Sequence, residues 1–455
     1  MGTIKTTFSN NIDDTGKLKE GSLGFSAGTS WQAIKTSDFT AVAGEGYFVD
    51  TTSGAITVTL PSSPSAGDYV VLKDYARTWA TNNVTTSSAL FDGVASQTPS
   101  FSTNGQTITI VYMDGTKGWS LVNEDTTTGL GAQFVTATGG TILTSGDYKT
   151  HVFTGDGCFV VSSVGNPAGS TSVEYLVVAG GGSGGRYTAG GGGAGGYRQN
   201  YPSPTTAGLS VTAQTYPITV GGGGASVGPA GAIGCGTANG NRGSNSVFST
   251  ITSTGGGGGG GCFPGVGPTF PTNGPGGSGG GAGRSGPAGG TGNTPPTSPS
   301  QGNNGGTTSG TPSDSAGGGG GGAGAVGTDG TSGSPGPGSS RGGGAGGIGS
   351  PIATAFFGPT SPSYGTPGPA PGRYFAGGGA AGTYDANPGT TNPGGSGGGG
   401  PSFGAATGGG ANALAGTAGT TNTGGGGGSC ATSSGQSNSP GAGGSGIVAI
   451  RYKYQ

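Results

Sequence analysis

Few residues in this sequence could perform acid–base or nucleophilic chemistry. His151 is the only histidine, and it lies in the strand-like stretch Tyr148–Phe153. No cysteine, serine or acid stands near it at a catalytic spacing, so we expect a packed or exposed strand histidine. Gly181–Gly185 has the form G-x-S-x-G, but no strand-to-helix pattern surrounds it and glycine is abundant throughout. The sequence therefore predicts no active site, and we expect a protein that is not an enzyme.

Metal and cofactor sites have equally little support. The four cysteines (Cys158, Cys235, Cys262 and Cys430) are widely scattered, without a CxxC pair or a histidine cluster. A zinc site or a disulfide scaffold would require such groupings. Chance matches to the dinucleotide-binding glycine pattern are unavoidable in this composition. We expect no cofactor and no metal ion.

Aromatic residues avoid the glycine runs and gather between them, most densely from Ala355 to Asp385. Loops of Tyr, Ser, Gly and Asn on a rigid frame are typical of binding surfaces, because aromatic rings give contact area at low entropy cost. The alternative is that these rings cover scaffold edges or pack on the terminal strands. With both interpretations open, the sequence predicts receptor binding by seven residues: Phe356, Phe357, Tyr364, Arg373, Tyr374, Phe375 and Tyr384.

Every basic residue between Gly180 and Gly446 is an arginine: Arg186, Arg198, Arg242, Arg284, Arg341 and Arg373. The planar guanidinium group can donate several hydrogen bonds to carbonyl oxygens. We therefore favour arginines that tie loop carbonyls together at the ends of glycine runs, over arginines that contact a ligand.

The overall composition excludes several classes of protein. The chain has 455 residues, of which 29% are hydrophobic and 7% charged, with a net charge of −2. So little apolar material cannot build one large core, and so little charge is unlike ordinary disorder. A chain without a basic surplus lacks the footprint of a nucleic-acid partner. No apolar run approaches the ~20 residues that span a bilayer, so we expect no membrane insertion.

Glycine content divides the chain in two. Residues 1–150 contain only 18 of the 117 glycines. We expect four parts: an extended arm at 1–29 that orders when it docks on a larger assembly, a β-sandwich module at 30–127, a linker at 128–147, and a glycine-rich domain at 148–455.

The module is predicted from short alternating segments separated by turn signals. They are Trp31–Ile34, Gly46–Asp50, Ala55–Leu60, Tyr69–Lys73, Thr107–Met113 and Trp119–Val122. Ile56, Val58 and Leu60 follow the strict two-residue period of a half-buried strand. No stretch keeps an apolar stripe at helical spacing for three turns. The fold class is therefore all-β, with almost no α-helix.

Strand-like sequence brackets the glycine-rich region. Tyr148–Phe153, Cys158–Ser162 and Val173–Ala179 precede it, and Ile447–Tyr454 follows it. A tight turn at Gly155–Gly157 joins the first two of these strands. We expect one domain whose two ends pair.

Three structures accept so much glycine. Collagen needs a strict Gly-X-Y repeat, which the run Gly255–Gly261 breaks. A flexible Gly/Ser linker is the second. The third is a packed array of extended polyglycine II helices, whose amides and carbonyls point outward and bond neighbouring chains. We favour the third because strands bracket the region, and the place of segment 291–316 in it stays open.

The glycine-rich region resembles the glycine-rich domain of bacteriophage tail fibres and adhesins, especially those of marine and cyanobacterial phages. The resemblance runs from His151 to Tyr452 through HVFTGDGCFVV, SVEYLVVAGGGSGG, GGGGAGGYR, YPITVGGGGA, GSNSVFSTITSTGGGGGGG and GGSGIVAIRY. Residues 30–124, with VAGEGYFVDTTSGAITVTLPSSPSAGDYVVLKD, are similar to a β-module repeated in phage fibre proteins. The resemblance implies polyglycine II helices that display variable loops and bind the host surface.

From these observations we expect a phage virion tail-fibre or adhesin protein, located in the virion. Residues 1–29 would be its virion-attachment arm, and its N-terminal region would contact other tail or baseplate proteins. Its partner on the host would be a cell-surface glycan or an outer-membrane protein. Fibres are commonly threefold, so a homotrimer is expected. The alternative is a purely structural virion component, a baseplate or head appendage with no receptor contact.

Overall fold

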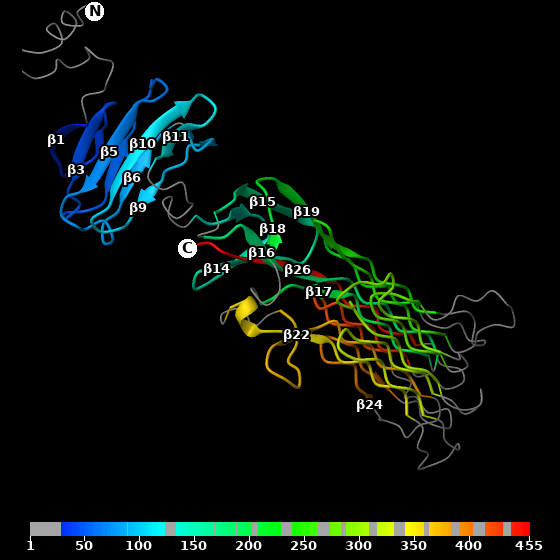
Figure 1. The fold of residues 1–455 in the computed structure, drawn as a ribbon. Coiled ribbons are helices and arrows are strands. Elements are labelled where there is room, and N and C mark those ends of the chain that lie inside the picture. The colour runs from blue at the N-terminus through cyan, green and yellow to red at the C-terminus, as the bar shows by residue number, and fades with distance from the viewer. Residues whose placement is uncertain are drawn as a thin grey trace, which may run out of the picture. The chain divides into compact units, whose positions relative to one another are not determined.

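A computed structural model gives the fold of the chain (Figure 1). It describes residues 29–88, 90–122, 133–166, 169–187, 189–202, 208–228, 239–261, 274–283, 288–308, 316–331, 342–358, 364–383, 391–403, 415–430 and 438–455. The chain forms two compact units. The first is Met1–Gln133 with Asn166–Gly169, and the second is Phe134–Gly165 with Ser170–Gln455. The expected arm at 1–29 lies almost entirely outside the described residues.

Two sheets make up the first unit. One has the order β1 (Ser30–Lys35), β3 (Glu45–Val49), β5 (Tyr69–Asp74), β10 (Thr107–Asp114), β11 (Gly118–Leu121), β7 (Leu90–Phe91), β8 (Val94–Ala95). The other has the order β2 (Phe39–Thr40), β4 (Ile56–Thr59), β6 (Val84–Ser87), β9 (Ser100–Phe101). From β1 to β6, successive strands alternate between the two sheets. Strands that pair within a sheet in this stretch are parallel: β1 with β3, β3 with β5, β2 with β4, and β4 with β6.

The core of the first unit lies between these sheets. Val49, Leu72 and Ile110 of the larger sheet and Val58 of the smaller one are fully buried in a single cluster. In β4 the alternation is as predicted, since Ile56 and Val58 are buried and Thr59 is exposed. The sandwich thus follows from period-two burial on one face of each strand.

The second unit also begins with two sheets. The central sheet has the order β13 (Thr141–Ser145), β14 (Tyr148–Phe153), β26 (Ile447–Lys453), β16 (Ser172–Val178), β17 (Tyr197–Gln199), and β18 (Leu209–Ser210) also pairs with β16. Beside it lies a sheet of order β12 (Thr136–Thr138), β15 (Gly157–Ser163), β19 (Thr215–Thr219), β20 (Ser246–Phe248), β21 (Ile251–Ser253). Two small hairpins complete the unit: β22 (Ser350–Ile352) with β23 (Arg373–Phe375), and β24 (Thr391–Asn392) with β25 (Ser402–Phe403).

The expectation that strands at both ends of the glycine-rich region pair is confirmed. β26 lies between β14 and β16 and is antiparallel to both. The turn that follows β14 does not close a hairpin, because β14 and β15 lie in different sheets and do not pair with each other. β12 and β13 lie in 128–147, the segment for which the sequence predicts a linker.

The fold is all-β. The described residues contain one 3₁₀ turn, Thr354–Phe356, and no α-helix. None of them forms a helix long and apolar enough to cross a membrane. The central sheet is buried on both faces, which explains the continuous apolar run Ile447–Ile450 of β26.

Candidate functional site

Beyond the sheets of the second unit, glycine runs lie side by side as extended chains without strand pairing (Figure 1). Their hydrogen bonds show a three-residue period. Along 180–185, successive amides donate to the carbonyl oxygens of Ser244, Gly444, Gly193, Asn241, Gly441 and Gly190, at 2.9–3.1 Å. Every third residue therefore faces the same neighbouring chain. This is the geometry of a polyglycine II helix, which has three residues per turn and no hydrogen bonds of its own.

The run 190–195 occupies the interior of this lattice. Its amides donate to three runs, through the carbonyls of Gly260, Gly318, Gly427, Gly257, Gly321 and Gly424, at 2.8–3.1 Å. Its carbonyls accept from three others, 180–185, 278–281 and 377–379. Six neighbours surround it, so each backbone group in the middle of the run is satisfied by a different chain.

Glycine is required here because the chains approach so closely. A Cβ built on Gly182 would lie 2.1 Å from the carbonyl oxygen of Gly257, and one on Gly192 would lie 2.1 Å from that of Gly182. No side chain fits at these distances. Run residues other than glycine, such as Ser183 and Ala194, are small and fully buried.

Segment 291–316 enters this lattice at 291–294 and 301–307, whereas residues 295–300 between them are mostly exposed. Asn293 donates from its backbone amide to Gly277 O, and Gly306 donates to Gly319 O, both at 2.8 Å. Gln301 is fully buried, and its amide oxygen accepts a hydrogen bond from the backbone of Thr254 at 2.8 Å. Residues 309–315 lie outside the described part.

The structure places four of the seven expected receptor-binding residues in the core. Phe356 and Phe375 are fully buried, Phe357 is 2% exposed and Tyr374 is 4% exposed. The expectation that their side chains contact a receptor therefore fails, because a folded chain does not present them to a partner. Tyr384 lies outside the described residues.

The three phenylalanines fill the junction between sheet and lattice. Phe356, Phe357 and Phe375 form one cluster with Leu176 and Ile447 of the central sheet and with Ala194 of the interior run. The Phe356 and Phe357 rings meet edge to face with centroids 5.1 Å apart. We call this group the junction cluster. Its role is packing, which is the alternative that the sequence left open.

Arg373 and Tyr364 lie at the edge of this cluster and are half-buried. The guanidinium of Arg373 donates to the backbone carbonyls of Tyr364, at 2.7 Å, and of Gly365. Arg242 likewise donates to Pro275 O. For these two arginines the carbonyl-tying interpretation is confirmed.

His151 is a buried strand residue. Its Nδ1 donates to Gly139 O at 2.6 Å, so its Nε2, 3.1 Å from the Tyr452 hydroxyl, accepts from that group. Burial lowers the pKa of His151 below its usual 6.5, and the positive charge of Lys149 acts in the same direction. Ser183, from the G-x-S-x-G match, is buried in the lattice and accepts from the Asn241 amide.

Cysteines and acids form no metal site in the described part of the chain. Within it, no group of three or more His, Cys, Asp or Glu side chains gathers. Cys158 is exposed and Cys430 is buried, and both are free thiols. Cys235 and Cys262 lie outside the described residues.

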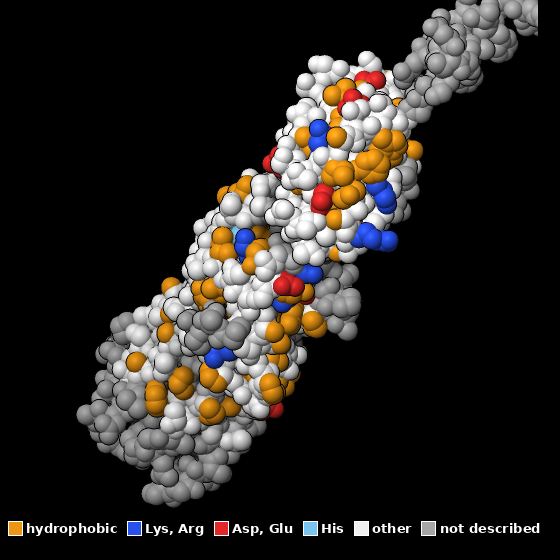
Figure 2. Space-filling model, turned by 90° about the vertical axis from the view of Figure 1, so that its left-hand side faces the viewer, with side chains coloured by type: hydrophobic (Ala, Val, Ile, Leu, Met, Phe, Trp, Pro, Cys, Tyr) orange, Lys and Arg blue, Asp and Glu red, His pale blue; other side chains and the backbone are white. Residues whose placement is uncertain are grey.

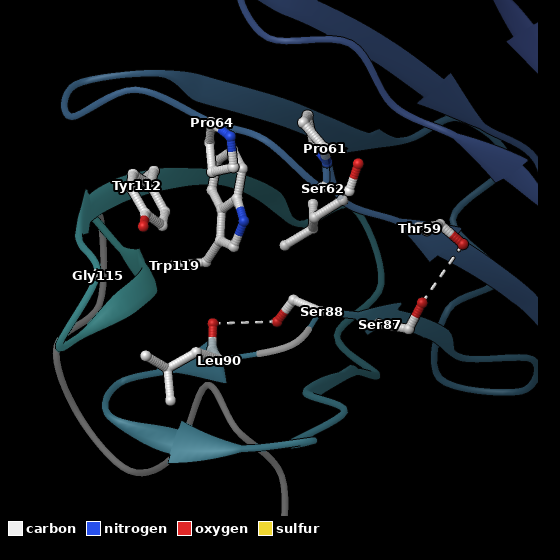
Figure 3. A pocket seen from close by; sticks show the side chains of 11 residues that line it. Thr59, Pro61, Ser62, Pro64, Ser87, Ser88, Leu90, Tyr112, Gly115 and Trp119 are labelled. Carbon is white, nitrogen blue, oxygen red and sulfur yellow. Dashed lines mark hydrogen bonds between the residues drawn. The ribbon is translucent and has the colours of Figure 1, made fainter.

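Sequence reasoning missed a cleft of about 480 Å³ in the first unit (Figure 3). Tyr112 of β10 and Trp119 of β11 lie on one side of it, with Pro64, while Ser62 and Ser88 face them. The signal was present in the sequence, since an aromatic residue stands on either side of the Asp114–Gly115 turn. Only the fold shows that the Pro61–Pro64 loop lies beside them.

These features define an all-β protein in which the strands of the central sheet hold both ends of a lattice of extended polyglycine II runs. The model of a family described as glycine-rich domain matches residues 154–453, and the chain belongs to this family. The match begins directly after β14 and ends with the last residue of β26. No curated protein matches the chain.

Proposed function

We propose that this chain is a tail-fibre or adhesin protein of a phage virion, and that its glycine lattice is a scaffold for host binding. The observation that carries the proposal is the interior run 190–195, whose amides and carbonyls bond six neighbouring runs. Such a lattice is rigid without a large apolar core. Rigid scaffolds favour binding because the partner need not order them.

The lattice separates its interior from the segments that connect its runs. Interior positions tolerate almost no side chain, whereas a connecting segment can change in sequence without entering a run-to-run contact. Variation confined to connections is what a receptor-binding protein needs, as antibody loops on a conserved sandwich illustrate. Among the coloured side chains in the lower-left part of Figure 2, over the glycine-rich domain, charged ones are isolated, which suits contact with neutral glycans.

In this proposal the first unit and the arm join the virion through other tail or baseplate proteins, and the working form is a homotrimer. The host partner is a surface glycan or an outer-membrane protein. The buried junction cluster takes no part in that contact. Tyr364 and the connecting segments remain as its candidates.

The test is binding of the fluorescently labelled full-length protein to marine bacterial and cyanobacterial cells. We expect it to bind a susceptible strain and to reduce phage adsorption to that strain. A variant with Pro296→Ser and Val326→Ser, two exposed residues between runs, should keep its melting temperature and bind more weakly. Normal adsorption in the presence of excess protein, without cell binding, would instead support a purely structural virion component.

A further inference from the structure

The cleft of the first unit lies where strands of both sheets end. Thr59 and Ser87 stand at the ends of β4 and β6 in the smaller sheet, and Leu90, Tyr112 and Trp119 come from the larger one. Its volume of about 480 Å³ is within the range of small-molecule sites. The cleft lies within a single unit, so it is defined without reference to the rest of the chain.

One wall of the cleft is aromatic. The Tyr112 and Trp119 rings pack edge to face with centroids 5.6 Å apart, and Pro64 lies beside them (Figure 3). Leu90 and Pro61 add further apolar surface. Such surfaces stack against the C–H faces of ring-shaped ligands.

The aromatic wall also carries hydrogen-bond donors. Trp119 is only 3% exposed, yet its indole N–H donates to no described residue, and in Figure 3 it is turned toward the space between Trp119, Ser62 and Ser88. The Trp119 Nε1 atom is not among the buried polar atoms without a partner in the described residues, so the cleft leaves it accessible. The Tyr112 hydroxyl also bonds no described residue. The indole donor of Trp119 is therefore available to a ligand in the cleft.

Hydroxyl groups opposite the aromatic wall, those of Ser88, Ser87 and Thr59, each take part in one hydrogen bond within the protein and keep further capacity to bond a ligand. Ser88 donates to Leu90 O at 3.2 Å, and Ser87 donates to Thr59 Oγ1 at 3.4 Å. The lone pairs of Ser88 and the hydroxyl proton of Thr59 remain available. The cleft therefore offers both donors and acceptors, and none of its lining residues is charged.

We propose that this cleft binds a neutral saccharide of one to three residues. Sugar hydroxyls donate and accept at once, and pyranose rings have an apolar face, so such a ligand matches both walls. A proline-rich peptide would stack on the aromatic wall, but its backbone offers carbonyl acceptors and few donors, which leaves Ser88 unsatisfied. The absence of charge disfavours acidic sugars. This inference does not rest on the proposed function of the glycine lattice.

The test is saturation-transfer NMR and titration calorimetry on the full-length protein with maltotriose, chitotriose and globotriose. Sialyllactose and a decaproline peptide serve as the acidic and peptide comparisons. Tyr112→Phe and Trp119→Phe each keep a ring and remove one donor, while Tyr75→Phe is the matched control at an exposed tyrosine outside the cleft. Melting temperatures verify that each variant is folded.

We expect at least one neutral trisaccharide to bind. Removal of either donor should weaken it about three- to tenfold, the worth of one hydrogen bond, while Tyr75→Phe leaves it unchanged. The inference is overturned if no neutral probe binds at 10 mM in ~0.15 M salt, if binding is indifferent to both donor variants, or if decaproline binds in their place. Loss of saccharide binding with intact adhesion to cells would separate this site from the proposed function of the lattice.

Discussion

The substitution Gly192→Ala tests whether backbone contact free of side chains holds the lattice together. Gly192 lies in the middle of the interior run, and the new Cβ would stand 2.1 Å from Gly182 O, whereas ordinary contact begins at 3.4 Å. The nearest atoms are backbone, so no flexible side chain can turn away. The runs 180–185 and 190–195 must therefore separate.

That separation strains three hydrogen bonds at once. Gly182 N to Gly193 O and Gly192 N to Gly427 O measure 2.9 Å, and Gly379 N to Gly192 O measures 2.8 Å. Overpacking costs about 1–3 kcal/mol, and one buried group left unsatisfied adds about 1–3 kcal/mol. Against this, alanine restricts the unfolded chain and returns about 0.4–1 kcal/mol. We expect a net loss of about 1–6 kcal/mol and a fall in melting temperature on the order of 10 °C.

Gly222→Ala is the matched control. Gly222 is the one exposed residue of the run 221–224, and a Cβ there would meet no atom within 4 Å. The same chemical change should leave the melting temperature unchanged or raise it slightly, because only the unfolded-state effect operates. Calorimetric melting of the purified variants measures both. Equal shifts in the two variants would refute the reasoning, since close packing would then not decide stability.

Three further predictions concern the sheets. Phe356→Ala should leave a cavity in the junction cluster and lower the free energy of unfolding by about 3–5 kcal/mol, as measured by thermal melting. An unchanged melting temperature would show that Phe356 is not a core residue. Glu174→Gln leaves its buried partner Arg451 unpaired and should cost up to about 3–5 kcal/mol, and adding Arg451→Met should recover much of it; a melting point insensitive to the single change would count against this. His151 is harder to protonate folded than unfolded, so the melting temperature should fall as pH drops below 6.5. His151→Gln should flatten that slope, and an identical profile would exclude His151 as its source.

The strands of the first unit were readable from the sequence where apolar residues alternate over four or more positions. The predicted Tyr69–Lys73 and Thr107–Met113 differ from β5 and β10 by one residue at the C-terminal end. β6 was missed because VTTS has a single apolar residue. The alternation of the chain between parallel strands was also missed, since the partner of a strand depends on contacts remote in sequence.

Within the lattice, the sequence indicated the kind of helix but not its neighbours. A glycine run has no side chain to select a partner, so the pairing of 190–195 with six particular runs cannot be read from the runs themselves. The aromatic residues were misread for a related reason. Clustering of Phe356, Phe357 and Phe375 between runs is compatible with both display and packing, and only their position against the central sheet decides between the two.

The need for that junction follows from the energetics of the lattice. Ordering a residue costs about 1–2 kcal/mol of backbone entropy, at the high end for glycine, while a hydrogen bond returns a net ~0.5–1.5 kcal/mol. The hydrogen bonds between runs therefore roughly offset the entropy cost of ordering the glycines, but they do not by themselves give the lattice a net stability. The surplus must come from apolar burial, and in the described residues the large apolar side chains of this unit concentrate on the central sheet, on the sheet beside it and in the junction cluster. Because β26 inserts between β14 and β16, the same sheet also joins both ends of the lattice, so the sheet and the lattice stabilise each other.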